Sequence, residues 1–167
     1  MKKYIFYSAV SIFILPFLGC SIFSLIPYGQ WKNQNSANNN PDVYISGVYI
    51  SSGNYYPCYW ENGNRTDLEI ESSSIGNQAS SIFIDGNDVY CGGIYLNPSS
   101  TANACYWKNG KLVKLSVSNT NNYSLVTSIY VTGGIVFCCG YEVISGNFIA
   151  CYWINNNKYS LISPNWL

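Results

Sequence analysis

The chain has 167 residues, with 8 Lys or Arg against 8 Asp or Glu, and it contains no histidine. A formal net charge of zero and a charged fraction of only 10% leave no basic surface for nucleic acid. Histidine is the commonest general base and a common zinc ligand, so we expect neither catalysis nor a metal nor another cofactor.

The N-terminus has the pattern of a membrane-targeting segment. Lys2 and Lys3 precede an uncharged stretch that runs from Tyr4 through Gln30, which is the layout of a secretory signal peptide. We therefore predict a signal peptide over residues 1–19. An uncleaved membrane anchor over Tyr4–Tyr28 is the alternative, since about 20 apolar residues suffice to span the hydrocarbon core. Both interpretations place the rest of the chain outside the cytoplasm.

The end of this segment, Leu15–Cys20, resembles a bacterial lipobox. Phe17 and Leu18 stand where such motifs usually carry Leu and a small residue. The resemblance implies that Cys20 is the site of lipid attachment and that the protein is a lipoprotein of the cell envelope, held in the membrane by its N-terminus.

Residues 29–41 are rich in Asn and show no apolar period. We expect residues 20–41 to be the lipidated cysteine followed by a tether that separates the domain from the bilayer. A displaced strand over Ser21–Ile26 is the alternative within this segment, because its sequence is similar to a strand predicted in the repeats.

Residues 42–167 are predicted to form one domain built from three repeats. The tripeptide Cys-Tyr-Trp begins at Cys58, Cys105 and Cys151, with spacings of 47 and 46 residues. A fixed period of about 40–50 residues is the mark of a repeat architecture. Other positions recur in step with the tripeptide: Val43, Val89 and Val136, and Gly47, Gly93 and Gly140.

The middle repeat shows its elements most clearly. Asn109 and Gly110 form a two-residue turn of the type that needs positive φ at both positions. The second and third strands are apolar at almost every position, so both faces of the sheet must be covered. The four antiparallel strands predicted here are Ser81–Ile84, Asp88–Leu96, Ala104–Lys108 and Lys111–Val117.

Three four-stranded antiparallel meanders, each of about 46 residues, predict an all-β fold. The run Asn87–Tyr90, a Gly-containing strand and then Ala104–Gly110 resembles the repeats of uncharacterised bacterial envelope lipoproteins with β-propeller-like architecture. The repeat also equals a kelch or WD40 blade in size. The resemblance implies an open or incomplete β-propeller and says nothing about a ligand, because propellers host many functions.

Three blades are fewer than the usual four to eight of a closed propeller. The first repeat also lacks its first strand, which would fall near the polar segment Asn33–Asn38. The expected monomer is an open arc with two exposed blade faces, which are surfaces for association. We expect two copies to close a ring as a homo-oligomer. The alternatives are completion of the ring by a different protein, a loosely stable open arc, and a truncated relic of a longer propeller.

Six cysteines besides Cys20 lie in the repeats. Their placement at equivalent positions favours burial as small apolar side chains. A disulfide or, less simply, a metal site are the alternatives. The six are Cys58, Cys91, Cys105, Cys138, Cys139 and Cys151.

The function expected from the sequence is the binding of an unidentified ligand without catalysis, and the alternative is a structural subunit. The Tyr-Trp pairs are expected to pack between sheets, because adjacent strand residues face opposite ways. The expected binding rim consists of the loops between second and third strands, residues 51–56, 97–103 and 143–147. The candidate ligand-binding aromatics are Tyr55, Tyr56, Tyr95 and Tyr141.

Overall fold

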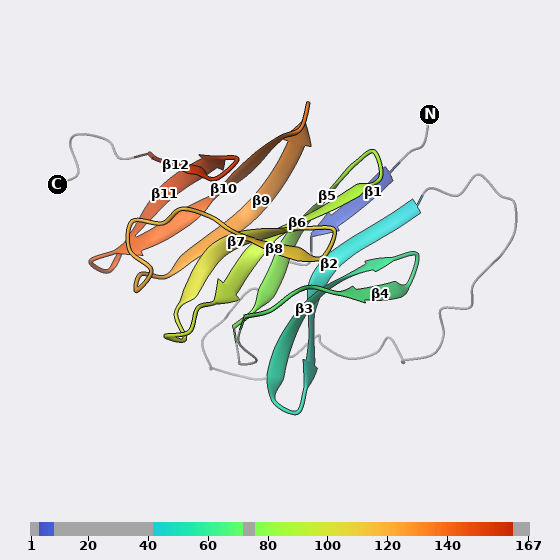
Figure 1. Ribbon diagram of the computed structural model, residues 1–167, viewed down its shortest axis with the longest axis horizontal. Coiled ribbons are helices and arrows are strands. Elements are labelled where there is room, and N and C mark those ends of the chain that lie inside the picture. The colour runs from blue at the N-terminus through green and yellow to red at the C-terminus, as the bar shows by residue number, and fades with distance from the viewer. Residues whose placement is uncertain (1–3, 9–41, 72–75, 162–167) are drawn as a thin grey trace, which may run out of the picture.

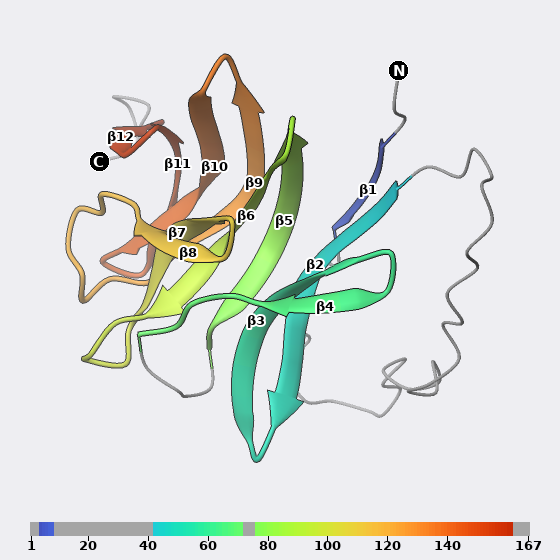
Figure 2. The same ribbon diagram turned by 45° about the vertical axis from the view of Figure 1, so that its right-hand side comes forward.

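The computed structural model describes residues 4–8, 42–71 and 76–161, and of residues 4–8 it describes the backbone alone. These residues form three sheets, none of which closes on itself (Figures 1 and 2). The described part of the chain has no helix that is long and apolar enough to cross a membrane. The all-β prediction is therefore confirmed, whereas the predicted lipid site Cys20 and the tether of residues 20–41 lie outside the described residues.

Each sheet consists of strands that are consecutive in the sequence. The first sheet contains β1 (Tyr4–Ser8), β2 (Asp42–Ser51), β3 (Asn54–Glu61) and β4 (Asn64–Asp67). The middle sheet contains β5 (Gln78–Asp85), β6 (Asp88–Leu96), β7 (Ala102–Lys108) and β8 (Lys111–Lys114). The last sheet contains β9 (Ser124–Thr132), β10 (Ile135–Ile144), β11 (Asn147–Ile154) and β12 (Asn157–Ser160).

The edge of the first sheet differs from the prediction. In the other two sheets the first strand, β5 or β9, pairs antiparallel with its successor. In the first sheet this place is taken by β1, which pairs in parallel with β2 through the register Tyr4↔Asp42 to Ser8↔Ser46. The expected position near Asn33–Asn38 lies outside the described residues. A parallel partner can come from far away in sequence because it needs no tight turn.

Asparagine turns fix the register at one end of every sheet. Asn62-Gly63 and Asn109-Gly110 have positive φ at both residues, with Asn109 at 50° and Gly110 at 82°. This confirms the predicted turn type, because its twist matches that of the flanking strands. The Asn109 side chain accepts a hydrogen bond from Val89 N (2.9 Å), while its backbone N donates to Val89 O (2.8 Å). The same reciprocal pair joins Asn62 to Val43 and Asn155 to Val136.

Repeated glycines mark a bulge next to the first strand. A Cβ atom on Gly93 would lie 2.0 Å from the carbonyl oxygen of Gln78, and one on Gly140 would lie 1.8 Å from that of Leu125. Both glycines sit where the register of the neighbouring strand shifts. Only glycine lets the two backbones approach this closely, which accounts for glycine at these two positions, whereas a Cβ on the equivalent Gly47 would meet the Trp60 ring at 3.2 Å.

The three sheets stack face to face in chain order, with the middle sheet between the other two (Figure 1). One apolar core lies between the first and middle sheets and includes Tyr44, Tyr59, Cys91 and Trp107. A second lies between the middle and last sheets and includes Tyr90, Val126, Cys138 and Trp153. The prediction that both faces of the middle sheet are covered is therefore confirmed.

Candidate interaction surface

Every sheet has two chemically different faces. Opposed residues of an antiparallel pair share a face and successive residues alternate, so the register places Trp60, Trp107 and Trp153 on one face of their sheets and Tyr59, Tyr106 and Tyr152 on the other. We call these the Trp face and the Tyr face. In both apolar cores, the Trp face of one sheet packs on the Tyr face of the preceding sheet.

A buried indole ties each Trp face to the segment that leaves the preceding sheet. Trp107 Nε1 donates to the carbonyl oxygen of Glu69 (2.8 Å), and Trp153 Nε1 donates to that of Ser116 (2.7 Å). Glu69 and Ser116 follow β4 and β8 respectively. Both indoles are fully buried, so each donor would be costly without its acceptor. The two internal interfaces are thus held by the same device.

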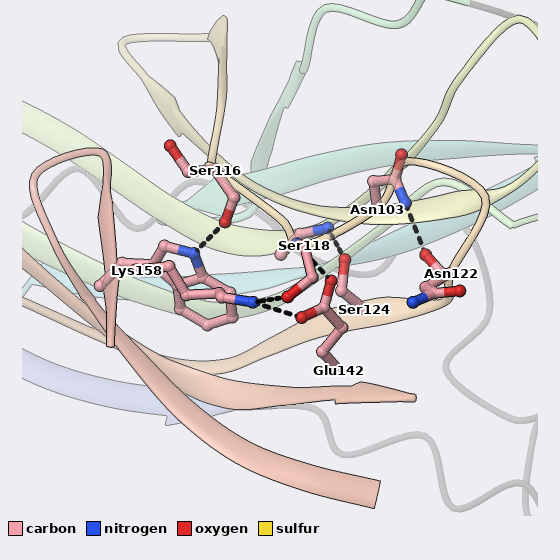
Figure 3. A network of polar contacts seen from close by, with 9 residues as sticks. Asn103, Ser116, Ser118, Asn122, Ser124, Glu142 and Lys158 are labelled. Atoms are coloured by element: carbon pink, nitrogen blue, oxygen red, sulfur yellow. Dashed lines mark hydrogen bonds and ion pairs between the residues drawn. The ribbon is translucent and has the colours of Figure 1, made fainter. Parts of the chain in front are cut away.

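The interface between the middle and last sheets also contains an ion pair. Glu142 of β10 has 1% of its side chain exposed and contacts Lys158 of β12. Its carboxylate also accepts a hydrogen bond from Ser118 N (2.7 Å), and Lys158 Nζ donates to the Ser118 hydroxyl. Figure 3 shows the Glu142 and Lys158 side chains converging on Ser118.

The ion pair determines the protonation state of the buried carboxyl group. Burial raises the pKa of Glu142, but hydrogen bonds from Lys158 and Ser118 outweigh it, so the pKa lies below its ordinary value of 4.5. The group is therefore an anion near neutral pH and carries no proton for general-acid chemistry. Its role in the described structure is to join the last sheet to the segment after β8.

The Tyr face of the last sheet is open within the described residues. Phe148 is 71% exposed and Tyr130 is 52% exposed. No charged residue lies on this face of β9 to β12. Its rings contact one another, with Tyr152 stacked on Tyr159 at 4.9 Å between centroids. Other apolar members of the surface include Ile135, Phe137, Cys139, Tyr141, Val143, Ala150 and Ile154.

The Trp face of the first sheet is the other outer face of the stack. Trp60 is only half-buried there, unlike its two equivalents. Tyr49 stacks on Tyr56 at 5.0 Å between centroids, and the Arg65 guanidinium lies 3.7 Å from the centre of the Tyr49 ring. Arg65 also forms an ion pair with Asp67 (2.9 Å). No further sheet covers this face among residues 42–71 and 76–161.

The structure places the four candidate aromatics in strands and does not gather them at one rim. Tyr55 and Tyr56 lie in β3, on opposite faces of the first sheet, and Tyr141 lies on the Tyr face of the last sheet. Tyr95, a candidate that already lay within the predicted strand Asp88–Leu96, is 5% exposed and belongs to the core between the first and middle sheets. Strand β6 continues to Leu96, one residue beyond it.

The expected rim loops are mostly tight turns. Ser52-Gly53 and Ser145-Gly146 are two-residue turns with positive φ at both positions. The longer loop after β6 is fixed by Asn97, whose side-chain oxygen accepts from the backbone N of Ser99 (2.9 Å) and of Thr101 (3.0 Å). Turns this short present few side chains to a ligand, so the sheet faces are the larger surfaces.

The cysteines follow the repeat, with one exception. None of the six described cysteines forms a disulfide, and all are buried except Cys139. The prediction of burial is wrong for Cys139, which lies on the open Tyr face of the last sheet. Burial raises the pKa of the Cys58 and Cys138 thiols to about 12 and that of Cys105 well above its ordinary value.

One polar cavity of about 350 Å³ lies between the first and middle sheets. Asp42, Tyr44 and Glu61 line one side, and the turn around Gly86 and Asn87 lines the other. The Tyr44 hydroxyl donates to Glu61 Oε1 (2.6 Å), so part of the polar lining is already paired. The described residues contain no cluster of three metal-ligating side chains. The cavity offers acidic hydrogen-bonding groups but no nucleophile–base pair.

Two features of these surfaces were missed in the sequence. Glu142 belongs to no motif, but it occupies the repeat position of Tyr49 and Tyr95, and Lys158 occupies that of Arg65 and Leu112. Aligning the repeats at these two positions would have revealed a substituted pair. Cys139 differs from its equivalents Ser46 and Gly92.

No family model matches the chain, and no curated protein or solved structure is significantly similar to it.

Proposed function

We propose that this protein acts by binding another protein, as a propeller-like assembly module whose outer sheet faces stack on a partner. The observation that carries the proposal is the open Tyr face of the last sheet. The equivalent positions of the middle sheet are covered, since Tyr90 is 4% exposed and Ala104 is fully buried. In the last sheet the counterpart of Tyr90, Phe137, is half-buried, and the counterpart of Ala104, Ala150, is exposed.

The exposed apolar side chains are concentrated at this end of the stack. Of the seven large hydrophobic residues that are exposed among the described residues, six belong to the last repeat. A contiguous apolar surface with no charge on it typically marks an association site. These residues are Tyr123, Tyr130, Ile135, Phe148, Tyr159 and Leu161.

The setting we propose is the outer side of a cell-envelope membrane. The basic residues Lys2 and Lys3 followed by a long uncharged stretch support export, and Cys20 is the proposed lipid attachment site; cleavage before Cys20 would remove β1 and leave β2 as the edge of the first sheet. A membrane-held chain diffuses in two dimensions, which raises its effective concentration toward a partner on the same surface. No catalytic step is proposed.

The reactivity of Cys139 tests this proposal. The thiol lies on the open face, so a covering partner must slow its alkylation by maleimide. We expect Cys139 to be labelled several-fold more slowly in membranes of cells that make the protein than in the urea-unfolded chain, with the labelled site located by peptide mass spectrometry. The buried Cys105 in the same sample is the internal control for folding. Equal labelling of Cys139 in both states, with Cys105 protected, contradicts the proposal.

A further inference from the structure

We infer that the partner is a second copy of this chain, bound head to tail. The Tyr face of the last sheet of one copy seats on the Trp face of the first sheet of the other. This inference rests on the proposed function and adds to it the identity of the partner and the surface that it uses.

The chain already contains this interface twice. Between the first and middle sheets, and again between the middle and last sheets, a Trp face packs on a Tyr face. Within residues 42–71 and 76–161 the stack therefore ends with one face of each kind that no further sheet covers, although Cys58 on the Trp face is itself buried. Trp60 and Cys58 stand at the positions of Trp107 and Cys105, and Phe137 and Tyr152 stand at the positions of Tyr90 and Tyr106. A third contact of the same kind needs no new surface chemistry.

The open Tyr face carries small residues at the positions where neighbouring sheets come closest to each other inside the stack. A Cβ on Gly92 would lie 2.7 Å from a methyl group of Val126, so the next sheet comes within van der Waals contact of this position. The equivalent residues are Ser46 in the first sheet and Cys139 in the last, both small. Ala150 likewise matches the fully buried Ala104. Cys139 is thus closer in size to Ser46, which is fully buried between the first and middle sheets, than to Gly92, and the open face carries small side chains at both positions.

The charges on the Trp face of the first sheet are compatible with such a contact. Arg65 stands at the repeat position of Lys158, which is accommodated inside the internal interface by its contact with Glu142. Arg65 is likewise neutralised, by Asp67, and lies over the Tyr49 ring. The Tyr face that would cover it carries no charge, so the pairing creates neither like-charge contacts nor an unpaired buried ion.

Two copies satisfy both open faces at once. Each copy supplies one Tyr face and one Trp face, so a two-fold arrangement forms two identical contacts and places the six sheets of two chains in one continuous succession. Head-to-tail contacts close into a ring when their rotation permits and otherwise extend into filaments. The inferred product is the closed pair, which leaves no open face.

Sedimentation velocity on the full-length chain in mild detergent tests the inference with one variant on each face. Ala150→Arg places a long charged side chain on the exposed Tyr face, and Trp60→Glu places a charge on the opposite outer face. We expect a two-chain species for the natural protein and single chains for either variant alone. An equimolar mixture of the two variants should form a one-to-one pair, because it retains one intact Tyr face and one intact Trp face.

Controls keep the test independent of folding. Ala150→Ser and Trp60→Phe should associate like the natural chain. Arg65→Glu, on the exposed strand β4, repeats the Trp-face test without altering a core residue. The inference is overturned if both Trp-face variants associate normally, since two Tyr faces would then be pairing with each other. The inference is also overturned if the natural chain remains a monomer at tens of micromolar.

The outcomes separate this inference from the proposed function. A natural chain that is single in solution but has Cys139 protected in membranes has a different protein as its partner, which overturns only the inference. Cys139 that is reactive both in membranes and in the purified chain overturns the inference and the proposed function together. Protection in both settings, with the mixed-variant pair formed, supports both.

Discussion

At the scale of single residues, the asparagine of each turn both adopts a positive φ and forms a side-chain hydrogen bond to the neighbouring strand. Asn109 adopts a positive φ of 50° and also provides the acceptor for Val89 N. Asparagine is among the few non-glycine residues that tolerate this backbone region. Its amide nitrogen also donates to Asp88 Oδ1 (2.7 Å). The turn therefore fixes both the end of the β7–β8 hairpin and the beginning of β6.

Substitutions at Asn109 should separate these two contributions. Asn109→Ala loses the side-chain hydrogen bonds, at about 1 kcal/mol, and keeps a Cβ in the left-handed region without the polar side chain that relieves its cost of about 1–2 kcal/mol in asparagine. Asn109→Gly loses only the bonding, so it should be the milder change. Free energies of unfolding from urea titration measure both. A glycine variant that is less stable than the alanine variant contradicts this account.

The buried indoles are the second residue-scale device. Trp107→Phe keeps most of the ring but leaves the carbonyl oxygen of Glu69 without its donor, and we expect a loss of about 1–3 kcal/mol in the free energy of unfolding. Trp60→Phe is the matched control, since Trp60 is half-buried and donates to no acceptor among the described residues. Equal losses for the two variants, measured on single chains, would show that the Glu69 contact is unimportant.

At the scale of elements, equivalent strands use different chemistry to fill one position. The pair Tyr95 and Leu112 in the middle sheet is replaced by Glu142 and Lys158 in the last. Ionisation of Glu142 is favoured in the folded state because its pKa lies below the ordinary value of 4.5. The contribution to stability is thus complete above about that pH and is lost as the pH falls through the lower folded-state pKa.

Glu142→Gln should therefore alter the acid limb of the stability curve. A broken buried ion pair typically costs about 3–5 kcal/mol in the free energy of unfolding. At neutral pH we expect a smaller loss for this variant, because Lys158 retains some contact with water. As the pH falls below the folded-state pKa, the natural chain and the variant should converge. Unfolding titrations at several pH values measure this. Asp85→Asn, an exposed carboxylate with no ion pair among the described residues, should leave the difference between neutral and acid pH unchanged.

Some strands and turns could be predicted from the sequence and others could not. The bounds of β6 and the Asn109-Gly110 turn could be predicted from apolar runs and turn chemistry, because these signals are local. Tyr95 lies in the strand predicted over Asp88–Leu96, but its burial depends on the packing of the first sheet, which local signals do not give. The pairing of β1 with β2 could not be predicted, since a parallel partner separated by more than thirty residues leaves no turn signal in the sequence.

At the scale of the whole molecule, the stack of sheets explains where side chains are protected. The repeat period predicted three sheets and apolar contacts between them, but it could not predict which of the two outer faces would be apolar. That distinction depends on substitutions at single repeat positions, Arg65 on one outer face and Cys139 on the other. The two faces are nevertheless the two halves of the internal interface.

Alkylation of the cysteines in the folded, purified single chain tests the stack most directly. The thiolate is the reactive form, and burial both blocks access and raises the thiol pKa. We expect Cys91, Cys105, Cys138 and Cys151 to resist maleimide until the chain unfolds, whereas Cys139 reacts at once when no second copy covers it. Rapid labelling of Cys91 and Cys105 under native conditions, or a disulfide between any of these residues, would contradict the face-to-face packing of the three sheets.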